Sequence, residues 1–314
     1  MFTTDTKTPT EITGDYIKSV VDIVNTVGGR ILEEQPFKTF VKEKFMKITY
    51  LGTAAAEGMP AVFCNCEFCK EARRLGGKNI RTRSQALIND DLLIDLPADT
   101  YHHFLQNNIE GHKIKYLFIT HSHQDHFYPD ELEMRSGDFA HDLDVPLMRA
   151  FLNSGSFKKC EKSFKDVETN EMTHFETVEL GEYKVTALPA RHFGGDKANI
   201  YIIEGEKTIL YAHDTGYFFD EVFEYIEKNG IKFDLISFDC TNVDIPISDG
   251  GSHMGLPNIR RALARLCEIG AVKEGTKKVI NHFSHNANPL QEILEEKVKA
   301  DGFLVAFDGL CLEI

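Results

Sequence analysis

From Met46 onward the chain alternates short apolar runs with polar turns, which is the pattern of strands in an α/β protein. Segments of this kind predict strands at Lys47–Gly52, Ser84–Ile88, Leu92–Leu96, Tyr116–Thr120, Lys184–Ala190, Ile200–Glu204, Thr208–Ala212, Asp234–Asp239, Lys278–Asn281 and near Phe303–Phe307. Apolar residues at helical spacing predict helices at Asp99–Asn107, Leu256–Glu268 and Leu290–Ala300. The pattern contains no internal repeat, so we expect one large domain over residues 46–314.

Residues 1–45 have a different pattern. After a polar, Thr-rich start, apolar residues recur at helical spacing from Tyr16 to Leu32, and Gly28-Gly29 interrupts this stretch. We expect an N-terminal helical extension that either packs on the main domain or contacts another subunit. The second arrangement predicts a homodimer.

The charge of the chain limits its partners. Its 314 residues include 49 acidic and 35 basic side chains, which gives a formal net charge of −14. Such a surface repels long polyanions, so an extended nucleic acid is disfavoured, whereas a small anion next to bound cations is allowed. No apolar run approaches membrane-spanning length and the N-terminus lacks the order of a secretory signal, so we expect no membrane contact and a cytoplasmic protein.

A cluster of polar residues directly follows the predicted strand Tyr116–Thr120. It places His121, His123, Asp125 and His126 within six residues. Neutral imidazoles and carboxylates are the ligands that suit zinc and the neighbouring first-row metals. A surface loop that happens to be rich in His is the alternative, but the spacing and the position after a buried strand favour a metal site.

A site for two metals needs about six to seven ligands, so this cluster should have partners further along the chain. Other predicted strands end close to residues of the same type, namely His192, Asp214, and the pair His282 and His285. A single His or Asp after a strand is more often a cap or turn residue. Together with the first cluster, however, the ordered set favours a two-metal site.

A second cluster contains three of the seven cysteines, Cys64, Cys66 and Cys69. A disulfide framework is not expected in a chain of this length without a secretion signal. Three thiolates require a fourth ligand for a closed tetrahedral zinc site. His285 lies three residues after His282, so it can turn away from the first site towards the cysteines. Three reduced cysteines in a loop are the alternative.

The ordered His and Asp residues resemble those of the metallo-β-lactamase superfamily, and the likeness covers residues 46–314. The resemblance implies an α/β fold, namely a four-layer αββα sandwich, here with the N-terminal helical extension, and two divalent cations, zinc or manganese. It assigns His121, His123 and His192 to the first metal, and Asp125, His126 and His282 to the second, with Asp214 bridging the two. Asp95 matches an acidic residue that orients the His cluster in the family, although an ordinary strand-end turn is the alternative.

The run Cys64-x-Cys66-x-x-Cys69 resembles that of the phosphodiesterase of the carbon–phosphorus lyase pathway and related cyclic-phosphate diesterases. In that group a Cys3His zinc is structural. His253 precedes the predicted helix Leu256–Glu268, and phosphodiesterase members of the superfamily carry a His at the matching place, which contacts phosphate and can protonate the leaving oxygen. A loop residue without a catalytic role is the alternative for His253.

The resemblance therefore implies a metal-dependent hydrolase, and more narrowly a phosphodiesterase that cleaves small cyclic nucleotides or cyclic ribose phosphates with a hydroxide shared by the metals. Asp125 would hold that hydroxide as well as ligating a metal. A lactone, thioester or lactam hydrolase would use the same metals, and pyrroloquinoline quinone biosynthesis proteins, which have a similar cysteine cluster, would predict an oxidative role. The acidic charge disfavours a tRNA-processing endonuclease, and the intact ligand set disfavours a non-catalytic metal-binding protein.

Residues 127–180 contain acidic stretches and the sequence Phe139-Ala140-His141, but no predicted strand and no recognisable ligand. We interpret them as a long insert that shapes the mouth of the substrate site.

Overall fold

The computed structural model describes residues 45–160, 162–193 and 195–314, and these residues form two β-sheets. The first sheet has the spatial order β14 (Leu310–Glu313), β1 (Lys47–Gly52), β2 (Gln85–Ile88), β3 (Leu92–Ile94), β4 (Tyr116–Ile119), β5 (Met148–Leu152), β6 (Val167–Glu171). The second has the order β13 (Leu304–Val305), β12 (Val272–Asn281), β11 (Phe233–Asp239), β10 (Thr208–Ala212), β9 (Asn199–Glu204), β8 (Tyr183–Pro189), β7 (Thr177–Leu180).

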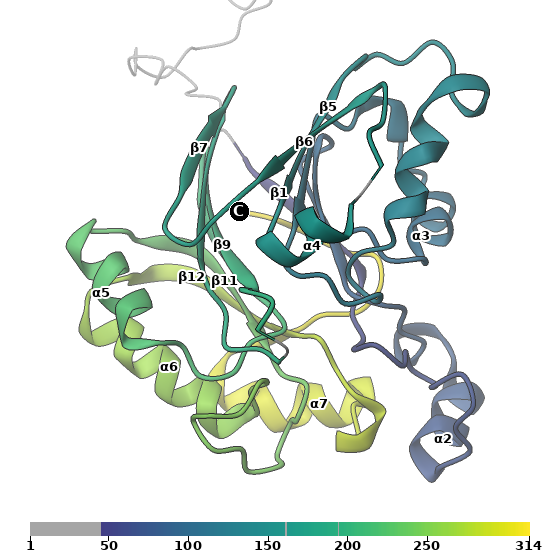
Figure 1. Cartoon of the computed structure of the whole chain (residues 1–314). Coiled ribbons are helices and arrows are strands. Elements are labelled where there is room, and N and C mark those ends of the chain that lie inside the picture. Colours follow the sequence, from purple (N-terminus) through teal and green to yellow (C-terminus); the bar gives the residue numbers. More distant parts are fainter. Residues whose placement is uncertain (1–44, 161, 194) are drawn as a thin grey trace, which may run out of the picture. The chain divides into compact units, whose positions relative to one another are not determined.

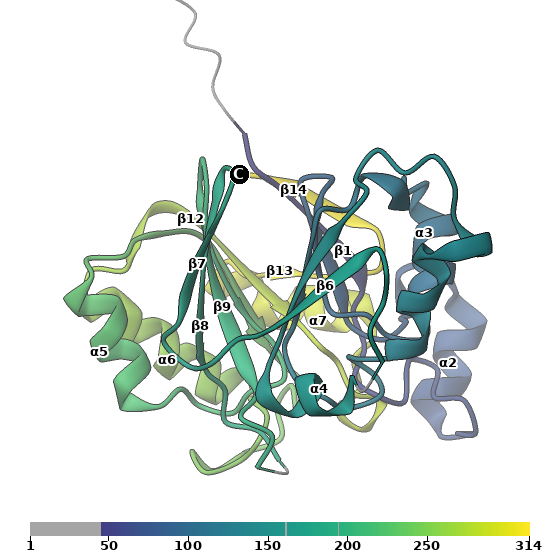
Figure 2. The ribbon, with the colours of Figure 1, turned by 45° about the horizontal axis from the view of Figure 1, so that its top comes forward.

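Helices cover the outer face of each sheet. Outside the second sheet lie α5 (Asp220–Lys228), α6 (Leu256–Glu268) and α7 (Gln291–Val298), and α3 (Thr100–Asn107) lies outside the first (Figures 1 and 2). This order of layers, helix, sheet, sheet, helix, confirms the predicted four-layer αββα sandwich. Two further helices, α2 (Glu67–Leu75) and α4 (Ser154–Lys159), precede β6 in the chain.

The alternation of side chains along the strands explains why the sheets pack in this way. In β4, Phe118 belongs to the apolar cluster between the two sheets, whereas Leu117 and Ile119 belong to the cluster under α3. In β11, Leu235 points between the sheets and Ile236 belongs to the cluster under α5 and α6. Because successive side chains of a strand face opposite ways, a strand that is apolar at every position is covered on both faces.

The predicted strands and helices are present, with boundaries shifted by a few residues. The strand expected at 278–281 begins earlier, at Val272, and the last expected strand is reduced to Leu304–Val305. The predicted N-terminal helical extension lies outside the described residues. Among the described helices, none combines the length and the apolar character needed to cross a lipid bilayer.

The interpretation of residues 127–180 as an insert is wrong for most of their length. They supply β5 and β6, which extend the first sheet in parallel to β4, and β7, which pairs with β8 in the second sheet. The edge strand β6 reads Val-Glu-Thr-Asn-Glu and is mostly polar, so its sequence carries no alternation that would predict a strand.

Strand direction brings the candidate ligands to one edge of the sandwich. In the first sheet β3 and β4 are parallel, and in the second β10, β11 and β12 are parallel. Strand β8 runs in the same direction as β10, because both are antiparallel to β9. The carboxyl ends of parallel strands meet at the same edge of a sheet, which is where α/β proteins place their sites.

We expect the packing between the sheets to dominate stability. Phe118 is buried, stacks on Phe151 at 4.8 Å between ring centroids and meets Tyr201 edge-on at 5.4 Å. The substitution Phe118→Ala should lower the free energy of unfolding by about 3–5 kcal/mol in urea denaturation, because it leaves a cavity between the sheets. Phe63→Ala is the matched control, since this ring is fully exposed. An equal loss of unfolding free energy in both variants would contradict the claim that packing between the sheets dominates stability.

Candidate metal centre

Sharp turns at the strand ends place three of the candidate residues. Asp95 and His282 directly follow β3 and β12, Asp214 lies two residues after β10, and their φ angles are 66°, 64° and 54°. Residues other than glycine rarely adopt this left-handed conformation, at a cost on the order of 1–3 kcal/mol each. Strained backbone of this kind clusters at functional sites, where the surrounding structure holds it.

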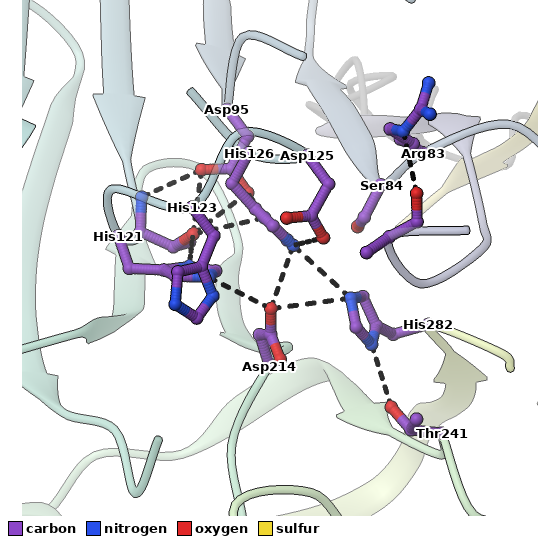
Figure 3. Close-up of polar contacts among 12 residues, drawn as sticks. Arg83, Ser84, Asp95, His121, His123, Asp125, His126, Asp214, Thr241 and His282 are labelled. Carbon is purple, nitrogen blue, oxygen red and sulfur yellow. Dashed lines mark hydrogen bonds and ion pairs between the residues drawn. The ribbon is translucent and has the colours of Figure 1, made fainter. Parts of the chain in front are cut away.

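Asp214 occupies the centre of the site, and Figure 3 shows it between His121, His126 and His282. Its Oδ2 lies 3.2 Å from Nε2 of His121, 3.0 Å from Nε2 of His126 and 3.6 Å from Nε2 of His282. The side chain is only 3% exposed. A buried carboxylate surrounded by ring nitrogens has the position expected of a ligand shared between two cations.

The other carboxylate oxygen of Asp214 faces two more imidazoles. Oδ1 lies 3.3 Å from Nδ1 of His192 and 3.0 Å from Nδ1 of His253. Asp214 is thus in contact with histidines from both sheets, including the loops after β4, β8 and β12.

The first ligand group contains His121, His123, His192 and Asp214, whose donor atoms all lie within 4.8 Å of one another. Nδ1 of His123 lies 3.0 Å from Nε2 of His121 and 3.1 Å from Nε2 of His192. Ligands at tetrahedral positions around zinc, with bonds of about 2.0–2.1 Å, are separated by roughly 3.3 Å. The three ring nitrogens therefore have nearly the spacing of ligands around one ion.

The second group contains Asp125, His126, His282 and again Asp214. Nε2 of His126 lies 3.3 Å from Nε2 of His282 and 3.4 Å from Oδ2 of Asp125. Both groups thus fit a metal in chemistry and spacing, and together they indicate divalent metal binding.

The pKa shifts differ among neighbouring histidines of the site. Burial opposes a charge on His126, but Asp95 and Asp125 raise the pKa of its ring well above the usual value. Burial lowers the pKa of His192 to about 4 and also lowers the pKa of His121. Neutral imidazole is the form that binds metals, so His121 and His192 need not lose a proton to do so.

Asp95 supports the group of histidines that follows β4. Its Oδ1 accepts hydrogen bonds from the backbone N–H of Thr120, at 2.8 Å, and from the Thr120 hydroxyl, at 2.9 Å. Its Oδ2 lies 2.7 Å from Nδ1 of His126 (Figure 3), which leaves Nε2 of that ring facing Asp214. This contact is the geometry that the predicted supporting role requires, because a carboxylate on the second nitrogen fixes the orientation of a metal-binding imidazole.

His253 lies beside the two groups. Together with His123, His192, Asp214 and His282 it lines a cavity of 330 Å³. Its side chain is partly exposed, and its Nδ1 is placed between carboxylates, those of Asp214 and of Asp239.

Asp239, at the end of β11, holds His253 as Asp95 holds His126. Its Oδ2 lies 3.2 Å from Nδ1 of His253, and Oδ1 accepts hydrogen bonds from the backbone of Thr241 and Met254. Burial opposes protonation of His253, but hydrogen bonds with Asp214 and Asp239 raise its pKa to about 10. The sequence around His253 does not predict the direction in which its ring points.

The cysteine cluster forms a separate group with His285. Nδ1 of His285 lies 3.4 Å from Sγ of Cys69 and 3.6 Å from Sγ of Cys66, and Cys64 completes a set whose donor atoms lie within 4.8 Å of one another. The backbone N–H of Cys69 and the ring of His285 lower the pKa of the Cys66 thiol to about 6. A thiol that ionises near neutral pH suits zinc binding, and the four donors fit a closed tetrahedral site.

Sequence reasoning missed several residues that support the site. Asp239 carried a signal, since it ends a predicted strand as Asp95 does. Thr241, whose hydroxyl lies 2.8 Å from Nδ1 of His282 (Figure 3), and Thr120 carried none. Residues 127–180 were expected to shape the mouth of the substrate site. None of the described residues in this range lines the cavity.

An αββα sandwich with two His/Asp groups at one edge of its sheets defines a class of metal-dependent hydrolases. The chain belongs to the metallo-β-lactamase superfamily, because a family model described as a beta-lactamase superfamily domain matches residues 93–283. That span is more than half of the chain and contains every ligand proposed for the two active-site metals.

Solved structures share this fold. A diphosphatase from the PhnP family is 22% identical, with a TM-score of 0.65, and the match covers 86% of this chain and 98% of that one. Zn2+-bound PqqB from Methylobacterium extorquens is 19% identical with a TM-score of 0.64, covering 85% and 100%, and YhfI from Bacillus subtilis is 17% identical with a TM-score of 0.64, covering 86% and 100%. At these identities the likeness shows the fold alone. A search of curated proteins finds no match.

We expect Asp95 to control metal affinity without touching a metal. The substitution Asp95→Asn keeps the size of the side chain but removes the charge that orients His126, and it should weaken metal binding about 10- to 100-fold in a competition titration with a chelator. Asp91→Asn is a control, because this carboxylate lies at the other end of β3 and binds Lys115 and Tyr183. Equal affinity in the Asp95 variant and the wild type would contradict the supporting role.

Proposed function

We propose that the protein is a phosphodiesterase that cleaves small cyclic nucleotides or cyclic ribose phosphates. The observation that carries this proposal is His253, an imidazole held by Asp239 at the wall of the cavity that members of both ligand groups also line. Hydrolysis of a phosphodiester expels an alkoxide, which needs a proton, and a fixed protonated imidazole is suited to donate it.

In this proposal His121, His123 and His192 would hold one cation and Asp125, His126 and His282 the second, and Asp214 belongs to both ligand groups. When bound, such cations lower the pKa of water and neutralise charge on the phosphate oxygens. Asp125 lines the cavity and its carboxylate forms an ion pair with His126, so it is also placed to orient the attacking water.

His253 supplies the proton, and Asp239 orients its ring. Because Nδ1 of His253 faces the carboxylates of Asp239 and Asp214, the proton that moves to the leaving oxygen would come from Nε2. Asp239 stabilises the protonated ring, in the way that a buried carboxylate orients the His of other acid–base pairs. The carboxylates of Asp214 and Asp239 raise the pKa of His253 to about 10, which favours the protonated ring.

The cavity supports a small substrate with a flat group. Its volume of 330 Å³ lies in the range of small-molecule sites. The ring of Phe193 lines it and is 64% exposed, so it offers a face on which a nucleobase can stack. The net charge of −14 supports a small anion over an extended nucleic acid, and the fold shared with a PhnP-family diphosphatase is consistent with phosphate chemistry.

We also propose that Cys64, Cys66, Cys69 and His285 bind one structural zinc. Cys66 caps the N-terminus of α2, and His285 lies three residues after the proposed ligand His282. A zinc at this place would join the α2 segment to the loop that carries His282.

The role of His253 predicts a dependence on the leaving group. The variant His253→Ala should lose about 10²- to 10⁴-fold in kcat on 2′,3′-cyclic AMP, whose leaving alkoxide needs a proton. It should lose much less on bis-p-nitrophenyl phosphate, whose phenolate leaves without one. Steady-state assays of the metal-loaded protein on both compounds measure this difference.

The same assays separate the rival functions. Asp239→Asn should follow His253→Ala in its dependence on the leaving group, although with a smaller loss. If the wild type hydrolysed only a lactone or a thioester, and His253→Ala did not change that rate, the proposal would be wrong and a carbonyl substrate would be favoured.

The structural zinc predicts a metal count. Elemental analysis of the wild type should give three metals per chain, and Cys66→Ala should give two. The remaining two should be those at the His/Asp groups. Any fall in the rate of hydrolysis should reflect only a change in the loop that carries His282, which the zinc would otherwise hold. An unchanged count of metals in Cys66→Ala would exclude the Cys3His site.

A further inference from the structure

One acidic side chain in the cavity has no part in the proposed chemistry. Glu57 lines the cavity together with His253 and His282, and its side chain is 31% exposed. It belongs to neither His/Asp ligand group nor the Cys3His group. Its Oε1 accepts a hydrogen bond of 2.5 Å from the hydroxyl of Ser284.

The position of Glu57 is fixed from both sides. The turn that carries it is closed by a hydrogen bond from Gly58 N–H to Ala55 C=O, and the backbone N–H of Ala55 is bound to the C=O of Phe283. Ser284 accepts hydrogen bonds from the backbone and the side-chain amide of Asn286, so its own hydroxyl proton is directed to Glu57.

The second carboxylate oxygen of Glu57 remains free to bind a ligand. Oε2 makes no hydrogen bond or ion pair within the described part of the chain, and Nε2 of His285 lies 3.8 Å from the other oxygen, Oε1. Because a carboxylate accepts hydrogen bonds and repels anions, this wall fits hydroxyl groups and not a phosphate.

The other residues that line the cavity also favour hydroxyl groups over a phosphate near Glu57. Among the described residues that line the cavity there is no lysine or arginine, and the lining includes the uncharged polar side chains of Ser284, Asn242 and Asn286. A second phosphate group would find no cation there except at the proposed metals. A sugar hydroxyl would find an ionised acceptor in Glu57, and such charge-assisted hydrogen bonds are among the strong ones.

We infer that Glu57 selects the alcohol part of the substrate, by accepting a hydrogen bond from a sugar hydroxyl and by excluding substrates that carry a second phosphate. This inference rests on the proposed phosphodiesterase function and narrows it. Among cyclic ribose phosphates and nucleotides, it favours those whose remaining position is a free hydroxyl over their phosphorylated forms.

A series of three substrates tests the inference. In 2′,3′-cyclic AMP the 5′ position carries a hydroxyl, and the derivatives carry hydrogen or phosphate there; for a protein that prefers 3′,5′-cyclic AMP, the 2′ position is varied in the same way. The wild type should prefer the hydroxyl compound over the deoxy compound by about 10- to 100-fold in kcat/KM, and over the phosphorylated compound by more.

The variant Glu57→Gln keeps an acceptor for Ser284 but loses the charge. It should reduce the preference for hydroxyl over hydrogen to within about threefold and improve the relative rate on the phosphorylated compound. Glu292→Gln, a substitution of an exposed glutamate on α7, is the matched control and should leave all the ratios unchanged. Metal content and melting temperature, measured on each variant, report any damage to the Cys3His site.

The outcomes distinguish failure of the role of Glu57 from failure of the proposed function. A parallel fall on all three substrates in Glu57→Gln, or no change in their ratios, would overturn the selective role of Glu57. Hydrolysis of bis-p-nitrophenyl phosphate but of no cyclic nucleotide would also overturn it, while phosphodiester hydrolysis would stand. If the wild type hydrolysed none of these compounds, the proposed function itself would fail.

Discussion

The carboxylate of Asp214 is buried among nitrogens of five imidazoles, and a buried anion is stable only where positive charge or hydrogen-bond donors surround it. The five rings come from loops that follow strands of both sheets. The two sheets must therefore end at the same edge, and the loops must turn inward within one or two residues. The left-handed backbone at Asp95, Asp214 and His282 meets this requirement at a cost that the packing between the sheets offsets.

The same arrangement of support occurs once in each sheet. Asp95 directly follows β3, accepts a hydrogen bond from the hydroxyl of Thr120 and faces Nδ1 of His126. Asp239 ends β11, contacts the hydroxyl of Thr241 at 3.2 Å and faces Nδ1 of His253. In the first case the free ring nitrogen faces the proposed metals, and in the second it is available to the substrate. A carboxylate at Nδ1 thus orients one histidine for metal binding and the other for proton donation. The role depends on what lies at the other ring nitrogen.

Much of the fold, and the candidate ligands that the structure brings together, could be predicted from the sequence, because buried strands and clustered His and Asp residues leave local patterns. Tyr116–Ile119 is apolar at every position, and His121 to His126 place four ligand types in six residues. The polar edge strand β6 has a weak pattern, and its place depends on its pairing with β5. The partnership of Asp239 with His253 and of Glu57 with Ser284 joins residues far apart in sequence, so no spacing predicted either.

The site divides by charge into a part that favours cations, around Asp214, and a wall that favours hydroxyl groups, at Glu57. All of the proposed chemistry depends on the first part. Crystals of the zinc-loaded protein, measured at the zinc absorption edge, test it most directly. The account predicts two anomalous peaks flanking Asp214, one near His121, His123 and His192 and one near Asp125, His126 and His282. A zinc peak at the cysteine cluster with none beside Asp214 would contradict it.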